Sequence, residues 1–204
     1  MIVVIVIVGV VVLAVVINVL VKQTSLKLSN RLKKEGRLIK RDQQFEDHTV
    51  FLSYADSHPD KLMDLLQTPG YLMSDAYTID DASPTEFSIH CQGKVKWDAR
   101  LLVEQAAAGR SQLTFIFTKW GEWSGLQWGS ANECLTVVER TVLGIDSKAQ
   151  IATVPTPLQN SILSGAVGMI ATALHNFTAS HQGELSYSNL AARYASAPAF
   201  KASA

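Results

Sequence analysis

The chain has 204 residues, enough for one compact domain with a hydrophobic core and a tail. Its formal net charge of zero is the sum of opposed parts, because eight basic residues and one acid lie between Lys22 and Arg41, whereas seventeen acids and ten Lys/Arg follow from Asp42 onward. An acidic domain of this kind argues against nucleic acid as a partner, since it has too little positive charge to neutralise phosphates.

Residues 1–21 form an aliphatic run that only Gly9 and Asn18 interrupt. As a helix this run is about 30 Å long, which matches the hydrocarbon core of a bilayer. The rival interpretation is a cleaved signal peptide, but no charged residue precedes the run and no A-x-A site follows it. We therefore expect an uncleaved, single-pass transmembrane anchor over residues 1–21.

The next segment, residues 22–46, is basic and is expected to lie at the membrane surface. Basic flanks stay on the cytoplasmic side, so the predicted location is the cell membrane, with the N-terminus outside and the C-terminal domain in the cytoplasm. Leu28, Leu32 and Ile39 share one helical face, so the segment is either an amphipathic helix on anionic headgroups or a solvated stop-transfer sequence. The predicted membrane-surface residues are Lys22, Lys27, Arg31, Lys33, Lys34, Arg37, Lys40 and Arg41.

A soluble domain is predicted over residues 47–178. A strand-like run at 48–55 precedes Pro59, which is typical of the first turn of a helix, and Leu62, Leu65 and Leu66 continue that helix. Three strand-like runs follow at 85–91, 95–105 and 111–120, spaced as an antiparallel meander.

The last third of the chain carries two further patterns. Residues 131–143 fit a helix by their apolar spacing and a strand by their β-branched content. Residues 158–177 carry an apolar stripe that predicts a long C-terminal helix. The tail, residues 179–204, is small and polar, and we expect it to be flexible or bound to a partner.

Two segments carry a resemblance to a known family. FLSYADSHPDKLMDLLQTPG (51–70) and KVKWDARLLVEQAAAGRSQLTFIF (94–117) are similar in element order to the START-like helix-grip superfamily of polyketide cyclase- and lipid-transport-like proteins. The resemblance implies an α+β fold in which an antiparallel sheet packs on a long C-terminal helix. It also implies either an apolar ligand between sheet and helix or a domain that has lost the ligand. The chain departs from the family in having fewer clear strands and a longer 131–154 segment.

No catalytic motif, metal-binding spacing or phosphate-binding loop is found, so no cofactor and no metal site is expected. Cys91 and Cys134 are expected to be free thiols. A cyclase- or hydrolase-like enzyme using His90 or Asp98 is the weakest of the functional hypotheses.

Four tryptophans form the one unusual cluster. They fit packing in a small sheet, anchors of a protein interface, or the lining of an apolar pocket. The candidate interface or pocket residues are Trp97, Trp120, Trp123 and Trp128.

The leading hypothesis is a non-catalytic accessory or stabilising subunit of a larger membrane complex, with the membrane and an integral-membrane protein complex as partners. The alternative is a membrane-tethered helix-grip module that binds an apolar ligand such as a lipid or isoprenoid.

Overall fold

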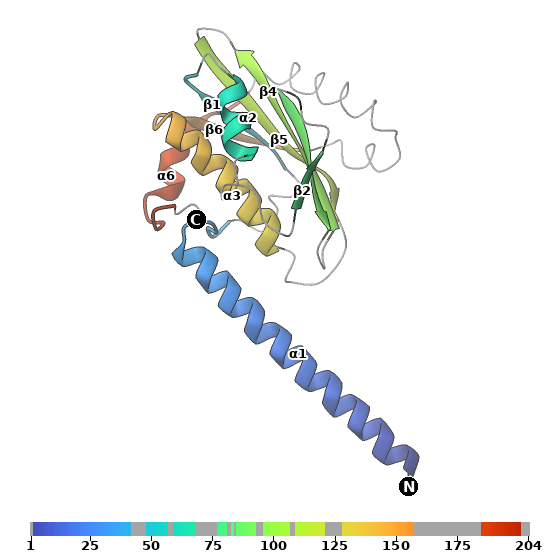
Figure 1. Cartoon of the computed structure of the whole chain (residues 1–204). Helices are drawn as coiled ribbons and strands as arrows, with labels where there is room; N and C mark the ends of the chain where they lie inside the picture. Colours follow the sequence, from blue (N-terminus) through green and yellow to red (C-terminus); the bar gives the residue numbers. More distant parts are fainter. Residues whose placement is uncertain are drawn as a thin grey trace.

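The computed structural model describes ten segments, residues 2–41, 48–56, 59–67, 77–80, 83, 85–92, 96–106, 109–120, 128–156 and 185–200. In this part of the chain, seven strands form one antiparallel sheet in the order β2-β3-β4-β5-β1-β6-β7 (Figure 1). The strands are β1 (His48–Tyr54), β2 (Tyr77–Asp80), β3 (Glu86–Gln92), β4 (Lys96–Ala106), β5 (Arg110–Trp120), β6 (Gln150–Pro155) and β7 (Ser188–Asn189). The helices are α1 (Ile2–Lys34), α2 (Pro59–Gln67), α3 (Trp128–Ile145) and α6 (Leu190–Tyr194).

The predicted meander is confirmed in its three central strands. β3 pairs with β4 and β4 pairs with β5, both antiparallel, with Phe87 opposite Leu101 and Leu101 opposite Phe115. Alternate residues of these strands point into the core because side chains alternate across a sheet. The strand predicted at 48–55 is β1, which lies between β5 and β6.

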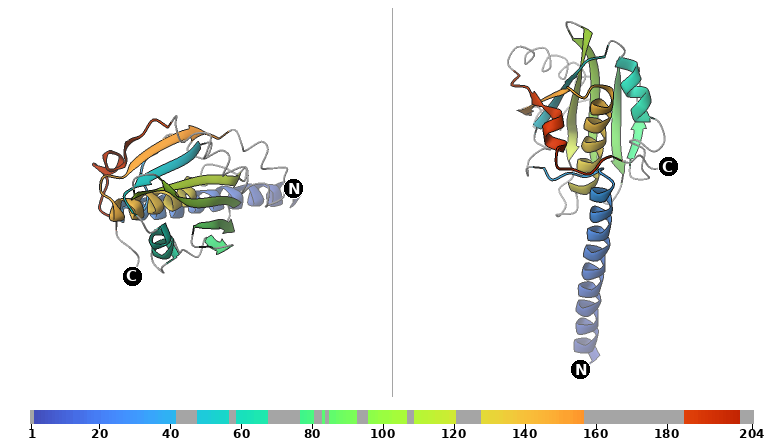
Figure 2. Two further views of the ribbon diagram at one scale, coloured as in Figure 1. Left: turned by 90° about the horizontal axis from the view of Figure 1, so that it is seen from above. Right: turned by 90° about the vertical axis from the view of Figure 1, so that its left-hand side faces the viewer.

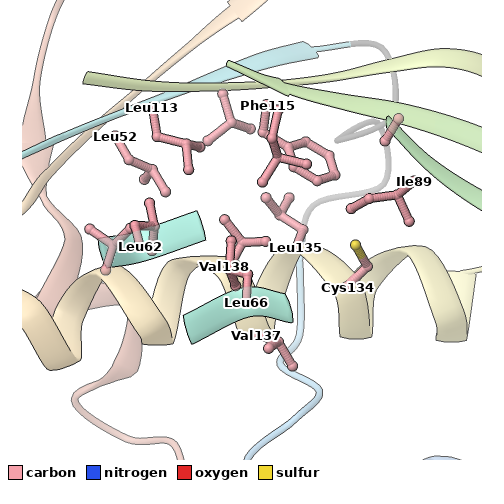
Figure 3. Close-up of a cluster of buried hydrophobic side chains, with 14 of the residues drawn as sticks. Leu52, Leu62, Leu66, Ile89, Leu113, Phe115, Cys134, Leu135, Val137 and Val138 are labelled. Atoms are coloured by element: carbon pink, nitrogen blue, oxygen red, sulfur yellow. The ribbon is translucent and has the colours of Figure 1, made fainter. Parts of the chain in front are cut away.

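The core fills the space between one face of the sheet and two helices, α2 and α3 (Figures 2 and 3). In Figure 3, Leu52, Leu113 and Phe115 point from the sheet toward Leu135 and Val138 of α3. Side chains of α2 enter the same layer, and Leu62, Met63 and Leu66 are at most 1% exposed. The ambiguous segment 131–143 is therefore a helix, because it covers the sheet.

The predicted fold is wrong about where the main helix lies in the chain. The sheet packs on α3, which lies between β5 and β6 in the chain, and the last described helix is α6, with five residues. The long helix predicted over 158–177 lies outside the described residues. After α3, β6 returns to pair with β1 on the side opposite β5.

The N-terminal predictions also need correction. A membrane-spanning helix needs about 20 predominantly apolar residues. In the described part of the chain, no helix is both long enough and apolar enough to cross a membrane. This finding overturns the predicted transmembrane anchor, the single-pass topology and the cell-membrane location with the domain in the cytoplasm. Instead of an anchor ending at residue 21, α1 continues through the basic residues to Lys34.

The C-terminal segment packs on its own domain over residues 185–200. β7 adds to the edge of β6, and Leu190 and Tyr194 of α6 are buried. Ala197 and Phe200 lie against the core. Residues 179–184 and 201–204 of the predicted tail lie outside the described residues.

Candidate functional site

Helix α1 projects away from the domain (Figure 1), and it carries exposed apolar side chains. Its 33 residues correspond to about 50 Å of helix. Because successive residues are about 100° apart on a helix, the exposed side chains spread over more than half of its circumference. Nine large apolar side chains of α1 are between 47% and 63% exposed: Val10, Val12, Leu13, Val15, Val16, Ile17, Val19, Leu20 and Leu26.

The end of α1 is fixed by a glycine. Gly36 has φ 69°, a left-handed conformation that favours glycine. Its amide donates to the carbonyl of Lys33 (3.2 Å), and the Arg37 amide donates to the carbonyl of Leu32 (2.9 Å). These two bonds make a Schellman motif, which ends the helix and turns the chain sharply.

After this turn, two arginines attach the chain to α3. Arg37 Nε donates to Glu133 Oε1 at 2.7 Å, and the Arg37 side chain is 3% exposed. Arg41 makes a forked contact, with 3.1 Å and 2.8 Å from its two terminal nitrogens to the oxygens of Glu139. Burial opposes the charge of Arg41, but Glu139 more than compensates and raises its pKa above the usual range. These pairs hold the base of α1 against the outer face of α3.

Glu139 also accepts a hydrogen bond from the C-terminal segment. The Tyr194 hydroxyl donates to Glu139 Oε2, and Arg193 Nη1 lies 3.7 Å from Glu139 Oε1. The Glu139 side chain is 0% exposed. Burial and the charge of Glu139 raise the pKa of Tyr194 well above its ordinary value. The buried carboxylate of Glu139 therefore joins three parts of the chain, which are the segment after α1, helix α3 and helix α6.

The C-terminal segment then closes over the turn at Gly36. A Cβ built on Gly36 would lie 2.6 Å from the carbonyl oxygen of Ala199 and 2.7 Å from that of Pro198. Arg140 of α3 donates to the Pro198 carbonyl at 2.7 Å and lies 4.5 Å from the centroid of the Tyr194 ring. We call the contacts among residues 36–41, α3 and residues 190–200 the junction.

The structure divides the predicted membrane-surface residues into two groups. Lys27, Arg31, Lys33, Lys34 and Lys40 are exposed, and Arg31 pairs with Glu35 along the helix. Arg37 and Arg41 are instead buried in the junction. Lys22 lies in α1, but its side chain is not among those described.

Of the four tryptophans, the structure describes the side chain of Trp97 alone. Trp97 is 0% exposed, packs edge-on to Phe117, and donates from Nε1 to Ser130 at 3.0 Å. Trp120 lies opposite Trp97 in the β4–β5 pairing, and Trp128 begins α3. Trp123 and the side chains of Trp120 and Trp128 lie outside what the structure describes. Trp97 therefore packs in the core, and the interpretation of the four tryptophans as an interface or pocket stays a prediction.

His90 and Asp98 are neighbours across β3 and β4. His90 Nδ1 lies 2.9 Å from Asp98 Oδ1, and its Nε2 lies 3.8 Å from Asp80 Oδ2. Both imidazole nitrogens thus face carboxylates, an arrangement that joins β2, β3 and β4. Among the described residues, no group of three or more His, Cys, Asp and Glu is placed to hold a metal ion.

One feature of the sequence indicates the junction. Asn132, Glu133, Thr136 and Glu139 interrupt the apolar pattern of 131–143, at spacings that place them on one side of a helix. Buried acids need partners, and the nearest excess of basic charge lies in residues 22–41. The partners are 96 residues apart in the Arg37–Glu133 pair and 98 residues apart in the Arg41–Glu139 pair, and no local pattern reveals contacts at such separations.

No family model matches the chain, and neither a curated protein nor a solved structure shows significant similarity to it. The resemblance to the START-like superfamily therefore stays a prediction.

Proposed function

We propose that the protein is a non-catalytic accessory subunit that stabilises a larger membrane protein complex, and that α1 is the element that docks onto it. The single observation that carries this proposal is the exposed aliphatic surface of α1. A helix that is apolar around most of its circumference is normally covered. The partner that fits is a set of apolar helices, because helices can pack on several sides of α1, whereas a flat surface covers one side.

The junction supports this proposal by giving α1 a fixed base. A docking element on a loose linker loses orientational freedom when it binds, and that loss weakens the complex. Here the buried pairs Arg37–Glu133 and Arg41–Glu139 hold the chain directly after α1. The domain and the base of α1 are thus ordered before binding.

Affinity purification of the full chain in mild detergent tests the proposal. The expected result is a stoichiometric membrane-protein partner. The same experiment with Leu13→Glu and Leu20→Glu together should lose the partner, because two buried charges at the interface are costly. Glutamate keeps high helix propensity, so α1 remains a helix.

The chain offers a matched control for this pair. Gln23 and Asn30 are also exposed on α1 and also seven residues apart. Gln23→Glu and Asn30→Glu add the same two charges in the polar half of the helix and should retain the partner. A protein that purifies alone, or that loses the partner equally in both double variants, contradicts docking through the apolar half of α1.

A further inference from the structure

We infer that residues 190–200 act as a strap that sets the direction in which α1 leaves the domain. This inference deepens the proposed function, since it concerns how the docking element is presented. The strap and the segment directly after α1 are far apart in sequence, yet they meet at Gly36 and at Glu139.

The first contact is steric and lies at the turn itself. The carbonyl oxygens of Pro198 and Ala199 occupy the volume where any side chain at residue 36 would begin. Gly36 therefore serves two needs, a left-handed backbone and a close approach of the strap. A shift in either segment requires the other to move.

The second contact is polar and is made through Glu139 of α3. Tyr194 of the strap and Arg41 of the segment after α1 both bind Glu139 Oε2, at 2.8 Å for Arg41. Arg140 adds a hydrogen bond to the Pro198 carbonyl and a cation–π contact with the Tyr194 ring. The strap and the segment after α1 thus share Glu139, so each stabilises the position of the other.

The consequence is a device in which the strap's attachment controls the freedom of α1. With the strap bound, the turn after α1 is enclosed between α3 and residues 198–199. With the strap detached, Gly36 lies open, and the chain after α1 keeps its arginine pairs and the hydrogen bond from Asn132 Nδ2 to the Ile39 carbonyl. Detachment also uncovers one end of the core, because Leu190 and Tyr194 belong to the same hydrophobic cluster as the sheet and α3.

Two substitutions in the full chain test this device. Gly36→Ala places a Cβ against Ala199 and should displace the strap, while Gly109→Ala is its control. Gly109 has nearly the same φ, 70°, but nothing lies within 4 Å of its added Cβ. Tyr194→Phe removes the hydroxyl bond to Glu139, and Tyr187→Phe is its control. Tyr187 also lies in the C-terminal segment, but its hydroxyl donates to Gln112 of β5 at 3.0 Å, away from the junction.

The direction of α1 is measured by the distance between spin labels at Lys27→Cys on α1 and Lys148→Cys on the domain, two exposed positions. The native thiols, Cys91 and Cys134, are buried and stay unlabelled. The unmodified background should give one narrow distance distribution. Gly36→Ala and Tyr194→Phe should broaden it, and Gly109→Ala and Tyr187→Phe should not.

Hydrogen exchange provides the second measurement. In Gly36→Ala and Tyr194→Phe, amides of residues 190–200 and 36–41 should exchange about tenfold or more faster, because a charged hydrogen bond of this kind is lost or strained. The proposal is overturned if both variants keep the narrow distribution, or if exchange rises on one side of the contact alone. If Gly36→Ala does not fold, Tyr194→Phe still decides. Neither measurement needs a partner, so failure of the strap and failure of the accessory-subunit proposal are separate results.

Discussion

Glu139 is a buried carboxylate whose charge is matched inside the protein by arginine. Its side chain is 0% exposed and that of Arg41 is 5% exposed. Breaking a buried ion pair leaves an uncompensated charge, which typically costs about 3–5 kcal/mol. We therefore expect Glu139→Gln to lower the free energy of unfolding by about that amount in urea denaturation.

Glu35 provides the control for this substitution. It lies 2.7 Å from Arg31, close to the 2.8 Å of the Arg41–Glu139 pair, but the Arg31 side chain is 75% exposed. Exposed pairs contribute about 0–1 kcal/mol, so Glu35→Gln should change stability by no more than that. Equal effects of the two substitutions would show that burial does not set the strength of the Glu139 pair.

Trp97 is a second residue whose role follows from its surroundings. Trp97→Phe removes the hydrogen bond to Ser130 and leaves a void beside Phe117. Together these losses should cost about 1–3 kcal/mol of stability in urea denaturation. Partner recovery should be unchanged, because the side chain is 0% exposed. Loss of the partner at full stability would instead favour the interface interpretation.

At the level of elements, the central strands were predictable and α3 was not. Strands β3 to β5 alternate apolar and polar residues, and that period of two is visible in sequence. In α3, β-branched residues such as Val137, Val138 and Thr141 favour a strand locally. The helix forms because its faces are buried between the sheet and the junction, and the Thr141 hydroxyl is satisfied within it by donating to the Val137 carbonyl at 2.8 Å.

The pairing within the junction was not predictable, for a different reason. Arg37 and Arg41 belong to the same basic run as Lys33 and Lys34, and composition alone does not separate them. Only the turn at Gly36 distinguishes the two groups, because it ends α1 and brings the chain onto α3. The tertiary partners then decide which basic residues are buried and which stay in solvent.

Helix α3 also offers a stabilising substitution. Gly144 lies in its last turn, and nothing lies within 4 Å of an added Cβ. Gly144→Ala should raise the free energy of unfolding by about 0.5–1 kcal/mol, because alanine loses less backbone entropy in a helix. Gly109→Ala should have the opposite sign, since its φ of 70° is unfavourable for alanine. Thermal or urea unfolding of both variants measures the difference, and the same sign in both would contradict this explanation.

At the level of the whole molecule, the structure combines a packed domain with one helix that leaves it. The domain buries its large side chains between sheet and helices, whereas α1 leaves its aliphatic side chains in solvent. The stability of the domain and the exposure of α1 are therefore separate properties, joined only at the junction. Substitutions in the apolar half of α1 should affect docking, and substitutions in the core should affect unfolding.

The response of the whole molecule to alkaline pH follows from its buried tyrosines. Burial, with the charge of Asp56 as a second cause, raises the pKa of Tyr54. Burial and Glu139 raise the pKa of Tyr194. Above the ordinary tyrosine pKa of about 10, the unfolded chain releases these protons while the folded protein keeps them. The contribution of these two tyrosines to the free energy of unfolding should therefore be constant below about pH 9 and fall above about pH 10.

The size of this fall can be assigned to single residues. Each such tyrosine contributes up to about 1.4 kcal/mol per pH unit between its unfolded and folded pKa values. Tyr54→Phe should reduce the slope of stability against pH by up to that amount, as measured by urea denaturation between pH 8 and 11. The comparison is made on the slope, because the substitution also changes stability at neutral pH. An unchanged slope in Tyr54→Phe would mean that the folded protein releases this proton as readily as the unfolded chain, and that the hydroxyl is not held in a dry core.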